Sequence, residues 1–272
     1  ELIMLSDIAG YVGADTCGCL LAIRQDQQEE ISLMIDIGTN GEMVLGNRER
    51  MVTCSTAAGP AFEGAKIECG MRGAAGAVDH VKYEDGKWNY TTVGNKPAVG
   101  LCGSGLIDLV AGLLDAGMLD ENGVLRSGQE KQGVFILVPP ERGGNERGVY
   151  LTQKDLGEVQ LAKAAIAAGI QMLMERLGIT EDDICSVYIA GAFGNYMNPV
   201  SAGKIGLLPA TLVKKVMLVG NAAGEGAKIA LVNEKEMLEM DELVRKIEFV
   251  ELAASADFQD HFIDELGFET GE

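Results

Sequence analysis

Glycine and polar residues follow an apolar segment in the run Asp36-Ile-Gly-Thr-Asn-Gly41. The flanking residues predict a strand at 31–37 and a returning strand at 42–46. A turn of this composition offers backbone N–H groups and a hydroxyl to a phosphate, because glycine has no side chain to block the approach. We expect Asp36 to organise Mg²⁺ and water as the catalytic residue. The candidate phosphate-binding residues are Gly38, Thr39, Asn40 and Gly41, with an ordinary hairpin turn as the alternative.

A second glycine junction follows the apolar strand expected at 184–190. Open α/β sheets place ligands at the carboxyl ends of their strands, and a glycine-rich gap there can accept a flat base and a ribose against the backbone. A plain loop is the alternative. The candidate nucleoside-binding residues at this junction are Gly191, Ala192, Phe193, Gly194 and Asn195.

The stretch 55–76 is dense in glycine and alanine and is expected to be a loop that leads into a short helix. Glu63 and Lys66 are three residues apart, so on a helix they would share a face and could bracket a ribose or an adenine. A surface ion pair is the alternative. Gly59 lies in the same stretch and is added to the candidate cofactor-binding residues.

Other common kinds of site find no support in the sequence. Neither G-x-x-x-x-G-K-[ST] nor G-x-G-x-x-G occurs. The two histidines, His80 and His261, are expected at the surface and offer no basis for a catalytic triad. The six cysteines contain no C-x-x-C pair, which disfavours zinc and ferredoxin-type clusters. A redox role for Cys17 and Cys19 is disfavoured because two residues apart on a helix they point to different sides.

The chain is strongly acidic, with a net charge of −19, which is the wrong sign for coating nucleic acid. Acidic residues concentrate after position 233, where they form either a solvated face or a docking surface for a basic partner. No signal peptide and no apolar run of membrane-spanning length is present. We therefore expect a cytoplasmic protein with reduced thiols, bound neither to nucleic acid nor to membranes.

Strands that alternate with helices predict an α/β fold. Two helices should pack closely against others, because small residues form stripes on them: Ala9, Gly13 and Cys17 on one, and Ala223, Gly226, Ala227 and Ala230 on the other. The expected helices are 6–23, 106–116, 154–177 and 222–232, followed by acidic helical segments. The expected strands, besides those above, are 50–54, 77–83, 87–93, 134–138 and 216–219.

In this order of elements the chain resembles the superfamily of sugar and acetate kinases, chaperone ATPases and actin. The resemblance implies an actin-like (ribonuclease H-like) ATPase lobe: a mixed sheet flanked by helices, with a β-rich insertion. It matches the hairpin at 36–41 to a phosphate loop of the second lobe, the junction at 191–194 to the adenosine motif, and the helices at 6–23 and 222–232 to the helices that cross at the hinge.

Three longer runs are similar to the C-terminal part of the reductive activators of corrinoid proteins, a family of ferredoxin-linked ATPases. They are Leu33-Met-Ile-Asp-Ile-Gly-Thr-Asn-Gly-Glu-Met-Val-Leu-Gly46, Cys54-Ser-Thr-Ala-Ala-Gly-Pro-Ala-Phe-Glu-Gly64 and Ile189-Ala-Gly-Ala-Phe-Gly-Asn195. The resemblance implies ATP with Mg²⁺ as cofactors and a corrinoid protein of a methyl-transfer system as partner. In that family ATP use drives electron transfer to an inactive Co(II) corrinoid, which becomes Co(I), in anaerobic metabolism.

Two features of the family are missing from the sequence, namely a first Asp-x-Gly-Thr hairpin and the cysteine pattern of a 2Fe–2S cluster. We therefore expect residues 1–30 to be the connecting helix from a first lobe, 31–250 the second lobe and 251–272 an acidic helical tail. The cluster is expected in a separate N-terminal domain, and this piece alone is expected to be inactive. The family also implies a homodimer. Two alternatives stay open, a small-molecule kinase of the same superfamily and a nucleotide-gated binding module without turnover.

Overall fold

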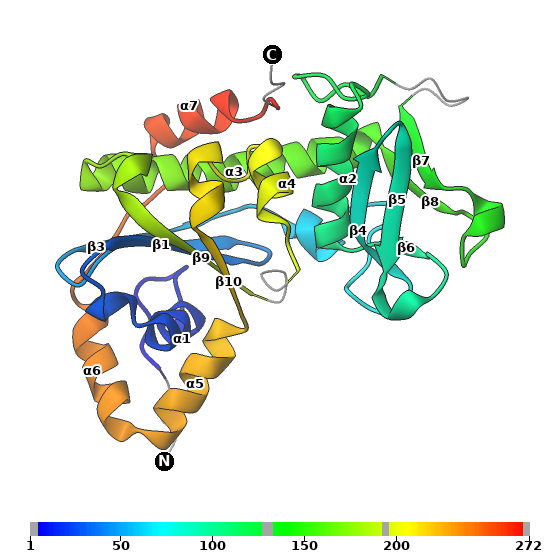
Figure 1. The fold of residues 1–272 in the computed structure, drawn as a ribbon. Coiled ribbons are helices and arrows are strands. Elements are labelled where there is room, and N and C mark those ends of the chain that lie inside the picture. The colour runs from blue at the N-terminus through cyan, green and yellow to red at the C-terminus, as the bar shows by residue number, and fades with distance from the viewer. Residues whose placement is uncertain (1–4, 127–132, 192–195, 269–272) are drawn as a thin grey trace.

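The computed structural model describes residues 5–126, 133–191 and 196–268, and within them a mixed sheet forms the centre of the molecule (Figure 1). Its strands lie in the order β10-β9-β1-β2-β3-β11. Strands β1, β2 and β3 form the predicted antiparallel meander, and β9 and β10 continue the sheet in parallel with β1. The bounds are β1 Ile31–Ile37, β2 Gly41–Gly46, β3 Met51–Thr56, β9 Ile184–Ala190, β10 Val216–Gly220 and β11 Ile247–Phe249.

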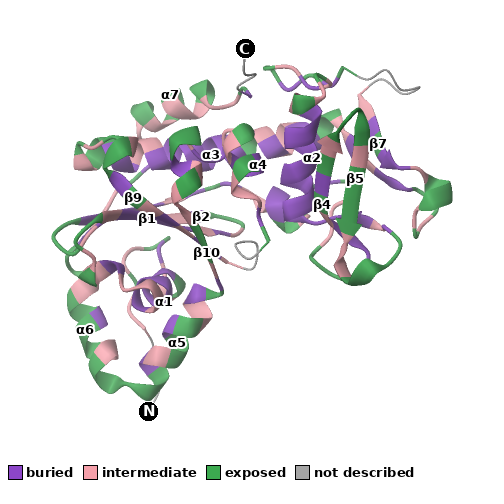
Figure 2. Cartoon of the chain, viewed as in Figure 1, coloured by how far each residue is buried: buried purple, intermediate pink, exposed green. Residues whose placement is uncertain are grey.

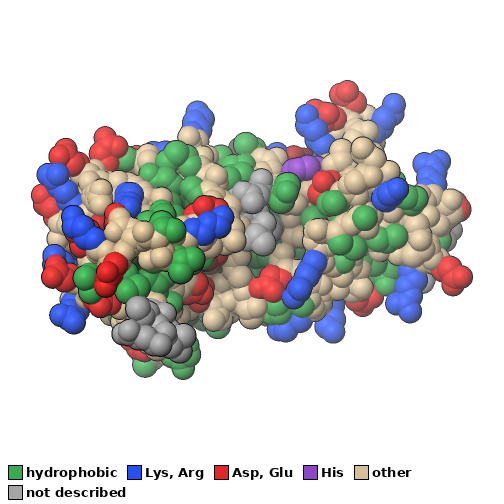
Figure 3. Space-filling view, turned by 90° about the horizontal axis from the view of Figure 1, so that it is seen from below, with side chains coloured by type: hydrophobic (Ala, Val, Ile, Leu, Met, Phe, Trp, Pro, Cys, Tyr) green, Lys and Arg blue, Asp and Glu red, His purple; other side chains and the backbone are tan. Residues whose placement is uncertain are grey.

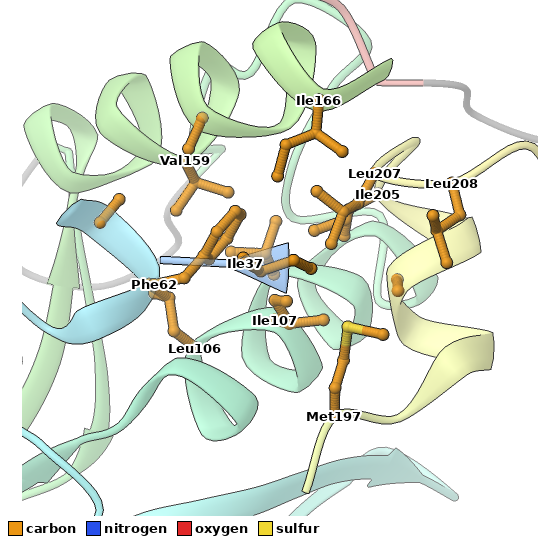
Figure 4. Close-up of a cluster of buried hydrophobic side chains, with 14 of the residues drawn as sticks. Ile37, Phe62, Leu106, Ile107, Val159, Ile166, Met197, Ile205, Leu207 and Leu208 are labelled. Carbon is orange, nitrogen blue, oxygen red and sulfur yellow. The ribbon is translucent and has the colours of Figure 1, made fainter. Parts of the chain in front are cut away.

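Alternation along β1 assigns its side chains to two different cores. Leu33, Ile35 and Ile37 face the large core beneath helix α3 (Gln153–Leu177), whereas Met34 joins a smaller cluster with Cys19 of helix α1 (Ala14–Ile23). Because successive side chains of a strand point to opposite faces, the Asp36 carboxylate lies on the α1 side. The large core is shown in Figure 4, and buried residues fill the centre in Figure 2.

Helices α1 and α5 (Ala222–Val232) cross on the α1 side of the sheet, with α6 (Glu234–Val244) beside them (Figure 1). A Cβ added to Gly18 would lie 2.7 Å from the carbonyl oxygen of Ala223, and one added to Gly226 would overlap the carbonyl oxygen of Gly18. The expected close crossing is therefore present, and glycine makes it possible.

The helix predicted at 6–23 is shorter than expected, because it begins at Ala14 with Gly13 as its extended N-cap. A bridge between Ala9 and Val12 closes a turn in the preceding segment. The stripe of Ala9, Gly13 and Cys17 was therefore wrong, and Gly18 provides the close contact instead.

A β-rich part lies at one end of the molecule, where helix α2 packs on the three-stranded sheet and the two-stranded sheet lies beyond that sheet (Figure 1). Trp88 packs between Tyr83 and Phe135, with ring centroids 4.8 and 4.9 Å away. Helix α2 begins at Gly103, three residues before the predicted start. The bounds are β4 Ala77–Glu84, β5 Lys87–Thr92, β6 Gly100–Leu101, α2 Gly103–Asp115, β7 Val134–Val138 and β8 Val149–Thr152.

The last part of the chain contributes α4 (Pro199–Lys204) and α7 (Ala256–Asp264) to the α3 side of the sheet. Helix α7 packs on α3, and α6 is joined to α1 by an ion pair between Arg24 and Glu236 at 2.5 Å. Among the described residues, no helix has the length and apolar character needed to cross a membrane. Acidic and basic side chains are interspersed on the face seen in Figure 3.

Candidate functional site

Asp36 lies at the carboxyl end of β1, where the predicted phosphate hairpin begins. The backbone N–H of Gly38 donates to the carbonyl oxygen of Asn40 at 2.9 Å, which closes the turn. The Thr39 hydroxyl donates to Oε1 of Glu63 at 2.8 Å, so the short 3₁₀ helix η2 (Pro60–Glu63) is fixed beside the hairpin. The fold thus brings the candidate phosphate hairpin and the candidate residue Glu63 together.

The second glycine junction meets the first through Gly191, which follows β9. Strands β1 and β9 are parallel neighbours, so their carboxyl ends lie side by side. Gly191 has a φ of +92°, and its N–H donates to the carbonyl oxygen of Gly220 at 2.9 Å. A Cβ at this position would lie 2.7 Å from Oδ1 of Asp36. Only glycine fits, because both the φ and the carboxylate exclude a side chain. Ala192, Phe193, Gly194 and Asn195 lie outside the described residues.

A cavity of about 580 Å³ opens where these elements converge. It includes three predicted residues besides Asp36, namely Gly38, Glu63 and Gly191. Ile37 and Phe62 connect its wall to the large apolar core, as Figure 4 shows. The residues of the lining that the sequence reasoning missed are Met71, Arg72, Gly73, Cys102, Gly103, Ser104 and Tyr196.

The start of helix α2 forms one wall of this cavity through Cys102, Gly103 and Ser104. The first N–H groups of a helix have no partner within the helix and carry a partial positive charge, which suits an anion. No side chain caps this helix start. Arg72 is the one basic residue among the described residues that line the cavity. The signal in the sequence was the run Gly-Leu-Cys-Gly-Ser-Gly directly before an apolar helix.

Two half-buried carboxylates, Asp36 in the cavity wall and Glu42 beside it on β2, give the hairpin its electrostatic character. Burial raises the pKa of Asp36 above its usual value of 3.8, the nearby charge of Asp15 adds to the increase, and a hydrogen bond from Cys19 opposes it. Burial likewise raises the pKa of Glu42, which lies opposite Asp36 on β2, against a hydrogen bond from Ser55. A cation near Asp36 would reverse this desolvation penalty.

Five of the predicted residues that the structure describes do not line the cavity, and three of them, Gly41, Gly59 and Lys66, have contacts or backbone roles elsewhere. Gly41 is the first residue of β2, and a Cβ there would lie 2.9 Å from Oγ1 of Thr56 and 3.3 Å from Ile166 of α3. Gly59 has a φ of +77° and starts η2. Lys66 pairs with Glu158 of α3 at 3.2 Å.

The expectation that Glu63 and Lys66 share a helical face was wrong. Helix η2 ends at Glu63, Gly64 adopts a left-handed conformation, and Lys66 itself has a φ of +65°. Thr39 and Asn40 lie in the turn itself rather than in the cavity wall. The histidines also lie elsewhere: His80 contacts the buried Asp108 at 3.1 Å, and His261 contacts Glu175 at 2.9 Å.

The donor set fits Mg²⁺ better than a transition metal. No group of three or more His, Cys, Asp or Glu side chains that could hold a metal occurs in the part of the chain that the structure describes. Mg²⁺ keeps several waters and usually binds one or two carboxylates together with substrate phosphates. Asp36, which lines the cavity, could provide such a carboxylate.

Comparison with known proteins shows which family the chain matches. Residues 30–272 match the family described as "C-terminal domain of RACo the ASKHA domain". The chain is 37% identical to the corrinoid activation enzyme RamQ of Eubacterium limosum over 94% of this chain and 45% of that protein. It is 29% identical to the Co(II) methylated amine-specific corrinoid protein reductase of Methanosarcina barkeri, over 99% of this chain and 52% of that protein.

The solved structure of a reductive activator for corrinoid, iron-sulfur protein matches with a TM-score of 0.90 and 40% identity. The match covers 97% of this chain and 44% of the other chain. The chain thus spans about half the length of these relatives, and the expected actin-like ATPase fold is confirmed. The chain belongs to the family of C-terminal ASKHA domains of RACo, the reductive activators of corrinoid proteins.

Proposed function

We propose that this chain is the ATP-binding and ATP-hydrolysing part of a reductive activator that couples ATP use to reduction of a Co(II) corrinoid protein to Co(I). The observation that carries the proposal is the cavity in which the hairpin after β1, the end of β9 and the start of α2 meet. Family membership supports it, because relatives are named as activators or reductases of corrinoid proteins.

In this assignment Asp36 would hold Mg²⁺ through water and orient the attacking water. The hairpin residues Gly38 to Gly41, the start of α2 and Arg72 would compensate phosphate charge, since fixed N–H groups and a guanidinium are suited to phosphate oxygens. Glu63 and the segment 191–195 would contact the nucleoside. Lys66 would reach the nucleotide only after leaving Glu158, and Gly59 would act by shaping η2.

The electron would come from a 2Fe–2S cluster on another domain. The described cysteines are free, and burial raises the pKa of Cys17 to about 12. Such thiols are poor metal ligands, because thiolates are the form that binds. We further propose that the activator is a cytoplasmic homodimer whose partner is the corrinoid protein of a methyl-transfer system.

The test uses the full natural chain that carries this domain, mixed with a corrinoid protein under reducing conditions, with the cobalamin absorbance as readout. We expect ATP-dependent conversion of Co(II) to Co(I) in the wild type. Replacement Asp36→Asn should lower the rate by about a hundredfold or more, because a charged Mg²⁺-organising group is lost. The control is Asp85→Asn, the same chemical change in the exposed turn between β4 and β5.

Four results would contradict the proposal or its assignment of Asp36. Conversion of Co(II) to Co(I) without ATP would contradict the proposed coupling of ATP use to reduction. ATP binding without turnover would favour a nucleotide-gated module, and phosphate transfer to a small molecule would favour a kinase. Equal rates for Asp36→Asn and Asp85→Asn would show that Asp36 is not the catalytic residue.

A further inference from the structure

Helix α1 contacts the Asp36 carboxylate through Cys19. The Sγ atom of Cys19 lies 3.7 Å from Oδ2 of Asp36 and donates a hydrogen bond to it. Cys19 is completely buried, in an apolar cluster with Met34, Ala190 and Ala222. The other carboxylate oxygen, Oδ1, faces Gly191. The carboxylate is thus fixed between a thiol from α1 and the backbone of the β9 junction.

The position of the thiol depends on the crossing of α1 and α5. Cys19 directly follows Gly18, which touches Ala223 and Gly226 of α5. Helix α5 begins after β10, whose last residue, Gly220, accepts the N–H of Gly191. The contacts from α5 to α1, to Asp36, to Gly191 and back to β10 therefore form a closed ring. A change at the crossing would move the thiol relative to the carboxylate.

We propose that Cys19 is a positioning residue for Asp36, which keeps the carboxylate oriented for Mg²⁺ and water and relates its orientation to the crossing of α1 and α5. The proposal rests on the proposed function. The thiol suits this task because sulfur donates weakly. It orders the carboxylate without competing strongly with a cation. The C–S bond also reaches farther than the C–O bond of serine would from the same backbone.

The direct test is the infrared S–H stretching band of the full natural chain, which requires neither nucleotide nor activity. The component that disappears in Cys19→Ala is assigned to Cys19. We expect this component to shift in Asp36→Ala to the position of thiols without an acceptor. It should shift less in Asp36→Asn, which keeps a neutral acceptor and serves as the test if the alanine variant does not fold. A component that stays in place in both Asp36 variants would overturn the proposal.

The functional test compares Cys19→Ala with Cys17→Ala. Both cysteines are fully buried on α1, but Cys17 packs in a different cluster, with Leu21 and Met240. We expect Cys19→Ala to lower the ATP turnover number by about three- to tenfold, with the dissociation constant of ADP nearly unchanged. Cys17→Ala should change neither. Equal losses of ATP turnover in the two variants would overturn the proposal, because they would show that Cys19 contributes only packing. Absence of ADP binding by the wild type would refute the proposed function, whereas the infrared band would still report the contact.

Discussion

At Gly191 the cost of an unfavourable backbone conformation can be measured separately from the cost of a contact with Asp36. Its φ of +92° and the 2.7 Å between a Cβ and Oδ1 of Asp36 both oppose a side chain. Strained backbone costs about 1–3 kcal/mol, and a forced contact in a packed region adds about 1–3 kcal/mol. We expect Gly191→Ala to lower the free energy of unfolding by roughly 2–6 kcal/mol, the combined range of these terms.

The matched control is Gly178→Ala at the end of α3. Gly178 has a φ of +71°, but a Cβ there meets nothing within 4 Å. It should therefore lose only the backbone part, about 1–2 kcal/mol. Thermal unfolding can resolve the difference, because 1 kcal/mol shifts the Tm by roughly 2–4 °C in domains near this size.

The second readout is the affinity for Mg²⁺-ADP, measured by calorimetry on the full natural chain. Gly191→Ala should weaken binding by about tenfold or more, because the displaced carboxylate loses a charge-assisted contact of about 1.5–3 kcal/mol. Gly178→Ala should leave binding unchanged. Equal affinities and equal losses of stability in the two variants would refute the reasoning.

Further predictions concern pH, the helix crossing and the hairpin. Because the pKa of Asp36 is raised in the folded state, its stabilising effect is complete below the usual value of 3.8 and disappears as the pH rises through the folded pKa. Urea unfolding between pH 4 and 7 should therefore show a steeper decrease in stability for the wild type than for Asp36→Asn, and identical slopes would contradict this. Gly226→Ala should destabilise by about 1–3 kcal/mol or more, because its Cβ would overlap the carbonyl oxygen of Gly18. Gly157→Ala, in open space on α3, should instead stabilise by up to about 1 kcal/mol, and a Tm change of the same sign in both would be inconsistent with the crossing. Thr39→Val removes the hydrogen bond to Glu63, so ADP should bind about two- to fivefold more weakly with little change in Tm, and unchanged binding would exclude a role for that contact.

Strong local patterns predicted most of the fold. The strand at 31–37 and the helix at 222–232 have the predicted bounds, because alternating or small residues and flanking glycines define them locally. The start of α1 was missed because a stripe of small residues that contains a glycine fits both a helix and an extended cap. The end of η2 was missed because Gly64 and Lys66 adopt left-handed conformations that spacing alone does not reveal.

The sequence by itself determined the hairpin after β1, the glycine junction after β9 and the family resemblance, because each depends on a short contiguous run. Only the tertiary structure decided which of these residues share a cavity. It brought in Arg72 and the start of α2, directed Lys66 to Glu158, and placed the Cys19 thiol beneath Asp36. Such pairings join residues far apart in the chain. They are fixed by strand order and by how closely two helices can cross, and neither is encoded in local spacing.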